Sequence, residues 1–74
     1  MNYKAFFDDV LGWIHQANQI AAQYGMHSEQ FWAWVADSSG KLCQKYQNHQ
    51  LAIKQMLMLV EWLEGVYENM RERG

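Results

Sequence analysis

Residues 49–71 carry an apolar pattern with the period of an α-helix, and this pattern constrains the fold more than any other feature of the sequence. An α-helix advances about 100° per residue, so side chains three and four positions apart share one face. Most apolar residues of the segment form one broad stripe, made of Ile53, Met56, Val60, Leu63, Tyr67 and Met70 and widened by Leu57, Leu59 and Val66. Leu51, Met58 and Trp62 fall together outside that stripe. A helix that packs on one side needs a single stripe, so we expect this one to be covered from two directions.

Two further helical patterns precede this one. The apolar residues of segment 3–24 recur at spacings of three and four, namely Phe7, Val10, Ile14, Ala17, Ala21 and Tyr24, with Phe6, Trp13 and Ile20 beside them. The inner side of segment 29–46 follows the same spacing through Phe31, Val35, Ser38, Leu42 and Tyr46, with Trp34 on one edge and Trp32, Ser39 and Cys43 on the other. Three helices are therefore expected.

The ends of the helices are marked by residues that suit helix caps. Gly25 fits the left-handed conformation that often ends a helix, and Ser28 and Asn48 are good N-caps for the segments that follow. Segment 37–40, Asp-Ser-Ser-Gly, is the weak point of the second helix. A break near Gly40 is the alternative there, but the apolar spacing stays in phase, so we prefer a continuous helix.

Both connections are short, so neighbouring helices should run antiparallel. The sequence therefore predicts one all-α domain of residues 1–74, an antiparallel up-down-up three-helix bundle with helices at about 3–24, 29–46 and 49–71. The alternative is a long helical hairpin whose third helix is exchanged between two chains.

The composition holds more apolar residues than such a bundle can bury. A chain of 74 residues buries only about 60% of its unfolded surface. Half of the residues are hydrophobic and four are tryptophan. Large aromatic residues are enriched at protein interfaces, so this excess favours a protein that binds other proteins.

Charge and cysteine content argue against several classes of protein. The net charge is −2 and the six basic residues are scattered, so the basic footprint of a nucleic-acid-binding protein is absent. Asp8 and Asp9 interrupt the apolar region that a signal peptide would need. No apolar run approaches the roughly 20 residues that span a membrane. The single cysteine, Cys43, is compatible with a reducing compartment, so we expect a cytoplasmic protein.

The residues that bear chemistry do not form a recognisable site. The three histidines, His15, His27 and His49, are dispersed, and no zinc-binding spacing surrounds them. Carboxylates at Asp8, Asp9, Glu61 and Glu64 lack the facing histidines of a di-iron site. We interpret the acidic flank of residues 61–68 as solvated and paired with Lys41 and Lys45. We therefore predict that the protein binds no metal.

Catalytic nucleophiles also lack support. Cys43 has no base nearby in the sequence, and Ser38-Ser39-Gly40 is not a nucleophile elbow, because no strand precedes it. The sequence thus predicts that the protein is not an enzyme and has no cofactor or small-molecule substrate.

Residues 55–63 (Gln-Met-Leu-Met-Leu-Val-Glu-Trp-Leu) and 28–32 (Ser-Glu-Gln-Phe-Trp) resemble small orphan helical proteins encoded by phages and prophages of Gram-positive bacteria. Such proteins often act by binding a host or phage protein. The resemblance implies the same kind of role for this chain and assigns no functional residue.

We therefore predict a non-catalytic phage or prophage accessory protein that acts through protein–protein interaction. The predicted partner-binding residues are Leu51, Met58 and Trp62, with Trp32 and Trp13 as secondary candidates. Gly65 lies near the first three and permits close approach by another chain. A homodimer formed through the third helix is the preferred assembly. The alternatives are a monomeric adaptor or inhibitor of a host macromolecule and a nucleic-acid-binding regulator.

Overall fold

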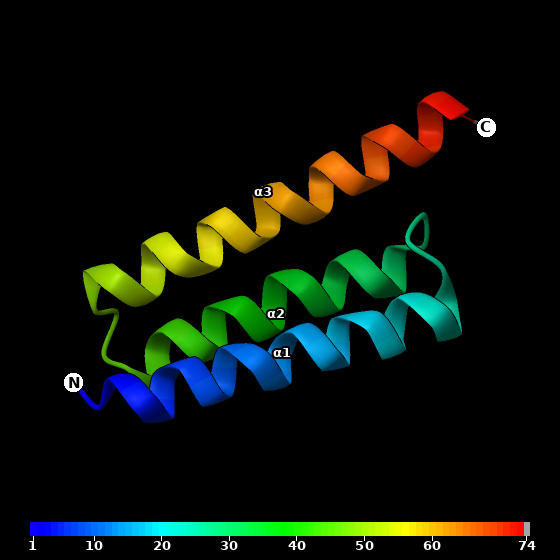
Figure 1. The fold of residues 1–74 in the computed structure, drawn as a ribbon. Coiled ribbons are helices and arrows are strands. Elements are labelled where there is room, and N and C mark those ends of the chain that lie inside the picture. Colours follow the sequence, from blue (N-terminus) through cyan, green and yellow to red (C-terminus); the bar gives the residue numbers. More distant parts are fainter. Residues whose placement is uncertain (74) are drawn as a thin grey trace.

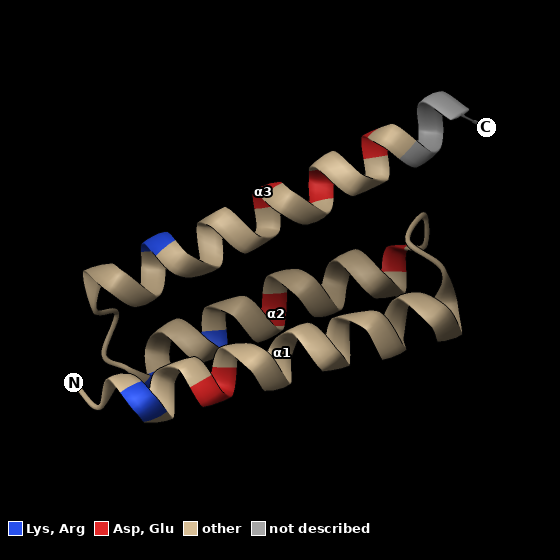
Figure 2. Ribbon diagram, in the orientation of Figure 1, with Lys and Arg blue, Asp and Glu red and all other residues tan. Residues whose placement is uncertain are grey.

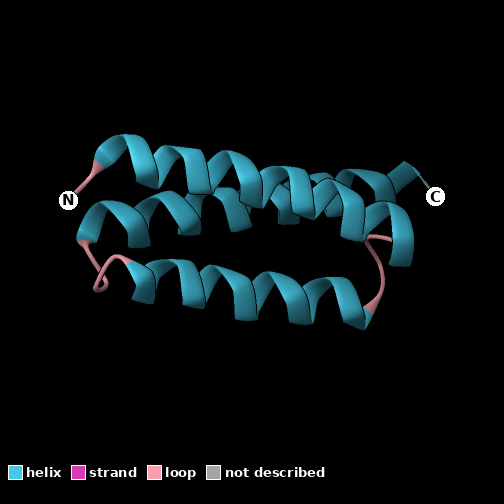
Figure 3. Cartoon of the chain, turned by 90° about the horizontal axis from the view of Figure 1, so that it is seen from below, coloured by secondary structure: helices cyan, strands magenta, loops and turns pink. Residues whose placement is uncertain are grey.

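The computed structural model describes the backbone of residues 1–73 and the side chains of residues 1–69, and it consists of three helices (Figure 1). Helix α1 spans Tyr3–Tyr24, α2 spans Glu29–Lys45 and α3 spans Gln50–Arg73. Successive helices run antiparallel, and α2 packs against both α1 and α3 (Figures 1 and 3). The prediction of an all-α up-down-up bundle is confirmed. The bundle is elongated, measuring 42 × 20 × 18 Å.

Residues suited to capping stand at the start of α1, at its end and at the start of α2. Asn2 Oδ1 accepts a hydrogen bond from the Ala5 amide at 3.0 Å, and Ser28 Oγ accepts one from the Phe31 amide at 3.1 Å. Each contact satisfies an amide that the first helical turn leaves without a partner. Gly25 follows α1 with a φ of +86°, which glycine tolerates without strain. The predicted roles of Gly25 and Ser28 are confirmed.

The predicted role of Asn48 is wrong. Gln47 and Asn48 both adopt left-handed conformations, with φ of 57° and 55°, and the Asn48 amide donates to the Cys43 carbonyl at 2.8 Å. Asn48 therefore belongs to the end of α2 rather than to the start of α3. The cap of α3 is His49, whose Nδ1 accepts a hydrogen bond from the Leu51 amide at 3.1 Å.

Helix α2 is continuous through residues 37–40, as the spacing of its apolar residues predicts. Ser38 Oγ donates to the Trp34 carbonyl at 2.6 Å, and Ser39 Oγ donates to the Ala36 carbonyl at 3.2 Å. Because both hydroxyls are satisfied by the preceding turn, these serines are tolerated inside the helix.

The core lies between the three helices and consists of Phe6, Val10, Trp13, Ala17, Phe31, Val35, Ala52, Met56, Leu59 and Leu63. Two helices are rotated relative to the predicted faces. In α1, Phe6 and Trp13 are buried while Phe7 is exposed; in α3, Ala52 is buried while Ile53 is exposed. Either face satisfies a spacing of three and four, so periodicity alone does not choose between neighbouring registers. The side chain of Met70, also assigned to the inner stripe, lies outside the described residues.

Candidate protein-interaction surface

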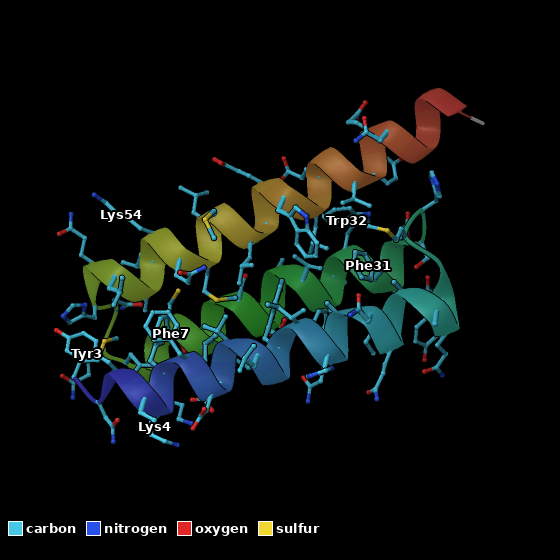
Figure 4. The ribbon with its side chains drawn as sticks, viewed as in Figure 1. Tyr3, Lys4, Phe7, Phe31, Trp32 and Lys54 are labelled. Carbon is cyan, nitrogen blue, oxygen red and sulfur yellow. The ribbon has the colours of Figure 1, made fainter. Side chains whose placement is uncertain are left out.

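Helix α1 has one flank beside α2 and another beside α3. The α2 flank is marked by two contacts: Trp13 Nε1 donates to Ser38 Oγ at 2.8 Å, and Lys45 Nζ lies 2.7 Å from Asp9 Oδ2. On a helical wheel, Phe7 and Leu11 fall on the opposite flank. Figure 4 agrees, because Phe7 projects from α1 toward α3. Phe7 and Leu11 therefore lie on the side of the bundle where α1 meets α3.

Helix α3 is divided in the same way. Ile53 and Leu57 share a shallow hollow with Ala36 and Gly40 of α2, so they mark the flank of α3 that lies beside α2. Leu51, Met58 and Trp62 fall on the other flank, which lies beside α1. The structure thus brings these three predicted partner-binding residues together on one side of α3.

We name these two flanks together the α1–α3 face and define it by Phe7, Leu11, Leu51, Met58 and Trp62. Four of these side chains are between 45% and 58% exposed, and Leu51 is half-buried. An aromatic side chain carries about 150–250 Å² and Leu and Met carry less, so these five side chains together expose roughly 400–500 Å² of mostly apolar surface. That area is at the upper end of what monomeric proteins expose in one patch, and such patches commonly mark binding sites.

The other two predicted residues do not belong to this face. Trp13 is 5% exposed, stacks on Trp34 with ring centroids 5.2 Å apart and donates its indole N–H to Ser38. Its assignment as a partner-binding residue is wrong, because the register of α1 places it in the core. Trp32 is half-buried on the α2–α3 side, where its Nε1 donates to the Met26 carbonyl at 2.7 Å and its ring meets Tyr67 edge-on at 5.8 Å.

The sequence pattern does not predict two residues of the α1–α3 face. It places Phe7 in the core and Leu11 on no face. The signal for both was present, since they are four residues apart and lie beside the line through Phe6 and Trp13. Phe6 and Trp13 mark the face of α1 that lies in the core. Phe7 and Leu11 therefore form a second apolar pair, on the flank of α1 opposite α2.

The surface between α1 and α2, which we name the α1–α2 face, is polar. Asp9 Oδ2 accepts hydrogen bonds from Lys45 Nζ at 2.7 Å and from Tyr46 Oη at 2.5 Å. These two donors hold the pKa of the Asp9 carboxyl below its ordinary value of 3.8. The hydrogen bond to Asp9 raises the pKa of Tyr46 from 10.0 to about 12. These three residues form what we name the Asp9 network.

The predicted pairing of lysines with the acidic flank of α3 is wrong. Lys41 pairs with Asp37 at 3.0 Å, and Lys45 pairs with Asp9. Both lysines lie on the side of α2 that faces α1, because the core residues fix the rotation of α2. The acidic residues of α3 border Trp32 instead, and they are Glu61, Glu64 and Glu68.

Reactive groups show no arrangement for chemistry in the part of the chain that the structure describes. Within it, no three His, Cys, Asp or Glu side chains lie close enough together to hold a metal ion. Burial raises the pKa of the Cys43 thiol above its ordinary value of 9.0, which disfavours the reactive thiolate. Among the same residues, no helix combines the length and apolarity that crossing a membrane requires.

Comparison of this chain with protein families, with curated proteins and with solved structures finds no match. The case for a function therefore depends on the geometry and chemistry of the α1–α3 face.

Proposed function

We propose that this protein acts without catalysis, by binding another protein through the α1–α3 face, and that its partner is a second copy of itself. The supporting observation is the exposure of Trp62 and Met58 on α3 and of Phe7 and Leu11 on α1, since each of these side chains is about half exposed. Tryptophan is the residue type most enriched among binding hot spots, and methionine adapts to irregular surfaces. Covering these side chains removes apolar surface from water, which favours association.

The resemblance to phage and prophage proteins supports a role as an accessory protein that acts through binding. A homodimer suits this role because a two-fold axis lets one apolar patch cover another of the same kind. Each subunit then needs only one self-complementary surface.

The test is the molecular mass in solution, measured by sedimentation for the wild-type chain and for two variants of α3. Trp62→Glu places a charge on the α1–α3 face, and Leu57→Glu places one on the α2–α3 side at a residue of similar exposure, 49% against 55%. We expect the wild-type chain to be a dimer at micromolar concentration, Trp62→Glu to be a folded monomer and Leu57→Glu to remain a dimer.

A wild-type chain that sediments as a monomer throughout the micromolar range would contradict self-association. The remaining candidate would then be a monomeric adaptor or inhibitor. The acidic residues Glu61, Glu64 and Glu68 around half-buried Trp32 favour a basic partner for such an adaptor. Binding of a purified basic partner that Trp32→Ala abolishes and Trp62→Ala preserves would support that function.

A further inference from the structure

A hollow of about 500 Å³ lies on the α2–α3 side of the bundle. We name it the Trp32 hollow, and its lining residues are Trp32, Glu61, Glu64, Gly65, Tyr67 and Glu68. We propose that this hollow binds an arginine side chain of a basic partner protein, with the guanidinium group stacked on Trp32 and paired with Glu61 and Glu64. The hollow contains no residue of the α1–α3 face, so this site is separate from the one on which the proposed function rests.

The aromatic wall of the hollow is held in one orientation. Trp32 Nε1 donates to the Met26 carbonyl at 2.7 Å, and the indole ring lies edge-on to Phe31 and to Tyr67, at interplanar angles of 88° and 86°. Figure 4 shows Trp32 between α2 and α3. Because the ring is fixed by these contacts and still lines the hollow, a ligand meets an aromatic surface that need not be reordered on binding.

Two carboxylates of the hollow have no cation partner among the described residues. The ion pairs of residues 1–69 all lie on α1 and α2, and they are Lys4–Asp8, Lys41–Asp37 and Lys45–Asp9. Partners on one helix stand three or four residues apart, but Lys54 stands seven residues before Glu61. The next basic residue of the chain, Arg71, stands seven residues after Glu64. Glu61 and Glu64 are therefore available to a cation from another molecule.

Negative charge gathers around the hollow. The lysines of residues 1–69 lie toward the end of the bundle that holds the α2–α3 turn, and the glutamates lie toward the other end (Figure 2). Glu61, Glu64 and Glu68 stand within two helical turns of each other, and like charges at these spacings repel. A bound cation reduces that repulsion, so the hollow is complementary to a positively charged ligand.

The shape and the donors of an arginine side chain fit this arrangement. A guanidinium group is planar, stacks on aromatic rings and carries five N–H donors, so it can lie on Trp32 and donate to two carboxylates at once. Gly65 stands four residues after Glu61 on the same helix, and a Cβ atom there would meet nothing within 4 Å. The missing side chain leaves room for the flat group beside the carboxylates. A lysine ammonium is a compact point charge and does not match a ring and two carboxylates in this way.

A titration followed by nuclear magnetic resonance tests the site, because the indole N–H signals of the tryptophans report on different places in the fold. The probe is the capped peptide Ser-Gly-Arg-Gly-Ser at millimolar concentration and low ionic strength, where exposed charges are least screened. We expect a saturable shift of the Trp32 signal and no shift of the Trp13 and Trp62 signals. The same peptide with citrulline, which keeps the shape of arginine without its charge, should not bind, and the lysine peptide should bind at least threefold more weakly.

Two double variants test the carboxylates. Glu61→Gln with Glu64→Gln changes two exposed side chains, so we expect the helical circular dichroism to be kept and the dissociation constant of the arginine peptide to rise at least tenfold. Asp8→Asn with Asp37→Asn is the matched control, because it removes the same charge from α1 and α2 outside the hollow. The control should change that constant less than twofold.

The outcomes separate this site from the proposed function. A Trp32 signal that stays unchanged at millimolar arginine peptide would overturn the site, and so would equal losses of affinity in the two double variants, since the attraction would then come from net charge alone. Equal affinity for the lysine and arginine peptides would overturn the assignment to arginine. Trp62→Glu should bind the arginine peptide as the wild-type chain does, whatever its mass in solution, so failure of the dimer leaves this site intact.

Discussion

The α1–α2 face and the α1–α3 face share one helix, yet their side chains differ: polar contacts join the helices at the first, and apolar side chains are exposed at the second. On the α1–α2 face, Asp9 accepts hydrogen bonds from Lys45 and Tyr46, and buried Trp13 donates to Ser38. The α1–α3 face instead ends in large apolar side chains that are about half exposed. One face is completed within the chain, whereas the other leaves apolar surface in water.

The difference lies in what each kind of contact specifies. Hydrogen bonds and ion pairs are directional, so the contacts of Asp9 and Trp13 select one rotation of α1 against α2. Apolar contact is not directional and scales with the area covered, so the apolar side chains of the α1–α3 face do not select one rotation of a helix. A partner bound to the α1–α3 face can therefore stabilise it, as the hydrogen bonds and the ion pair stabilise the α1–α2 face.

The largest expected contrast is between two tryptophans, buried Trp13 of α1 and half-exposed Trp62 of α3. Trp13→Ala removes a buried ring and should lower the free energy of unfolding by about 3–5 kcal/mol, because it leaves a cavity in the core. Trp62→Ala removes a half-exposed ring and should change the stability of the monomer by less than about 1 kcal/mol. Urea denaturation followed by circular dichroism, at a protein concentration low enough for monomer, measures both.

The same pair of variants should behave in the opposite way in association. Trp62→Ala should abolish the dependence of the melting temperature on protein concentration, since that dependence reflects binding between subunits. Equal losses of monomer stability in the two variants would contradict the distinction between a closed face and an open one.

Much of the fold could be predicted because it depends on local signals. The limits of α1, the caps at Gly25 and Ser28, and the continuity of α2 follow from residue type and spacing. The rotation of each helix depends on contacts between distant residues, such as Trp13 with Ser38, which periodicity does not encode. For this reason Phe7 was placed inside and Trp13 outside, the reverse of the structure.

The candidate surface was predicted in part. Leu51, Met58 and Trp62 could be grouped from sequence because they lie on one helix, where a rotation of a few tens of degrees keeps them together. The contribution of α1 could not be predicted in this way, since it depends on which flank of α1 lies next to α3. The Asp9 network was also missed, because it joins side chains 36 and 37 residues apart.

A smaller effect is expected at the hydrogen bond that closes the core toward α2. Ser38→Ala removes the acceptor of the Trp13 indole N–H and leaves a buried donor without a partner, which should cost about 1–3 kcal/mol of unfolding free energy. Ser39→Ala is the matched control, since Ser39 lies next in the same helix and donates to the Ala36 carbonyl within that helix. We expect the control to change stability by no more than about 0.5 kcal/mol. Equal effects would mean that the indole contact does not hold the two helices together.

The smallest effect concerns pH and the Asp9 network. The pKa of Asp9 is lowered in the folded state, so its stabilising contribution is present above pH 3.8 and is lost as the pH falls below that value. The pKa of Tyr46 is raised to about 12, so its contribution is present below pH 10 and is lost as the pH rises from 10 toward 12. The Asp9–Lys45 pair is largely at the surface, so its share is at most about 1 kcal/mol.

Melting temperatures across the two pH ranges measure these contributions. Tyr46→Phe should flatten the alkaline loss and keep the acid loss. Asp9→Asn should flatten both, because the hydrogen bond to Asp9 is the main cause of the raised pKa of Tyr46. Lys4→Gln, which breaks the exposed pair with Asp8 on the same helix, should leave both ranges unchanged. If Asp9→Asn retained the alkaline loss of stability, the hydrogen bond between Tyr46 and Asp9 would not be the cause of that loss. Packing alone would then hold α1 against α2, and the two faces would differ only in how far their apolar side chains are covered.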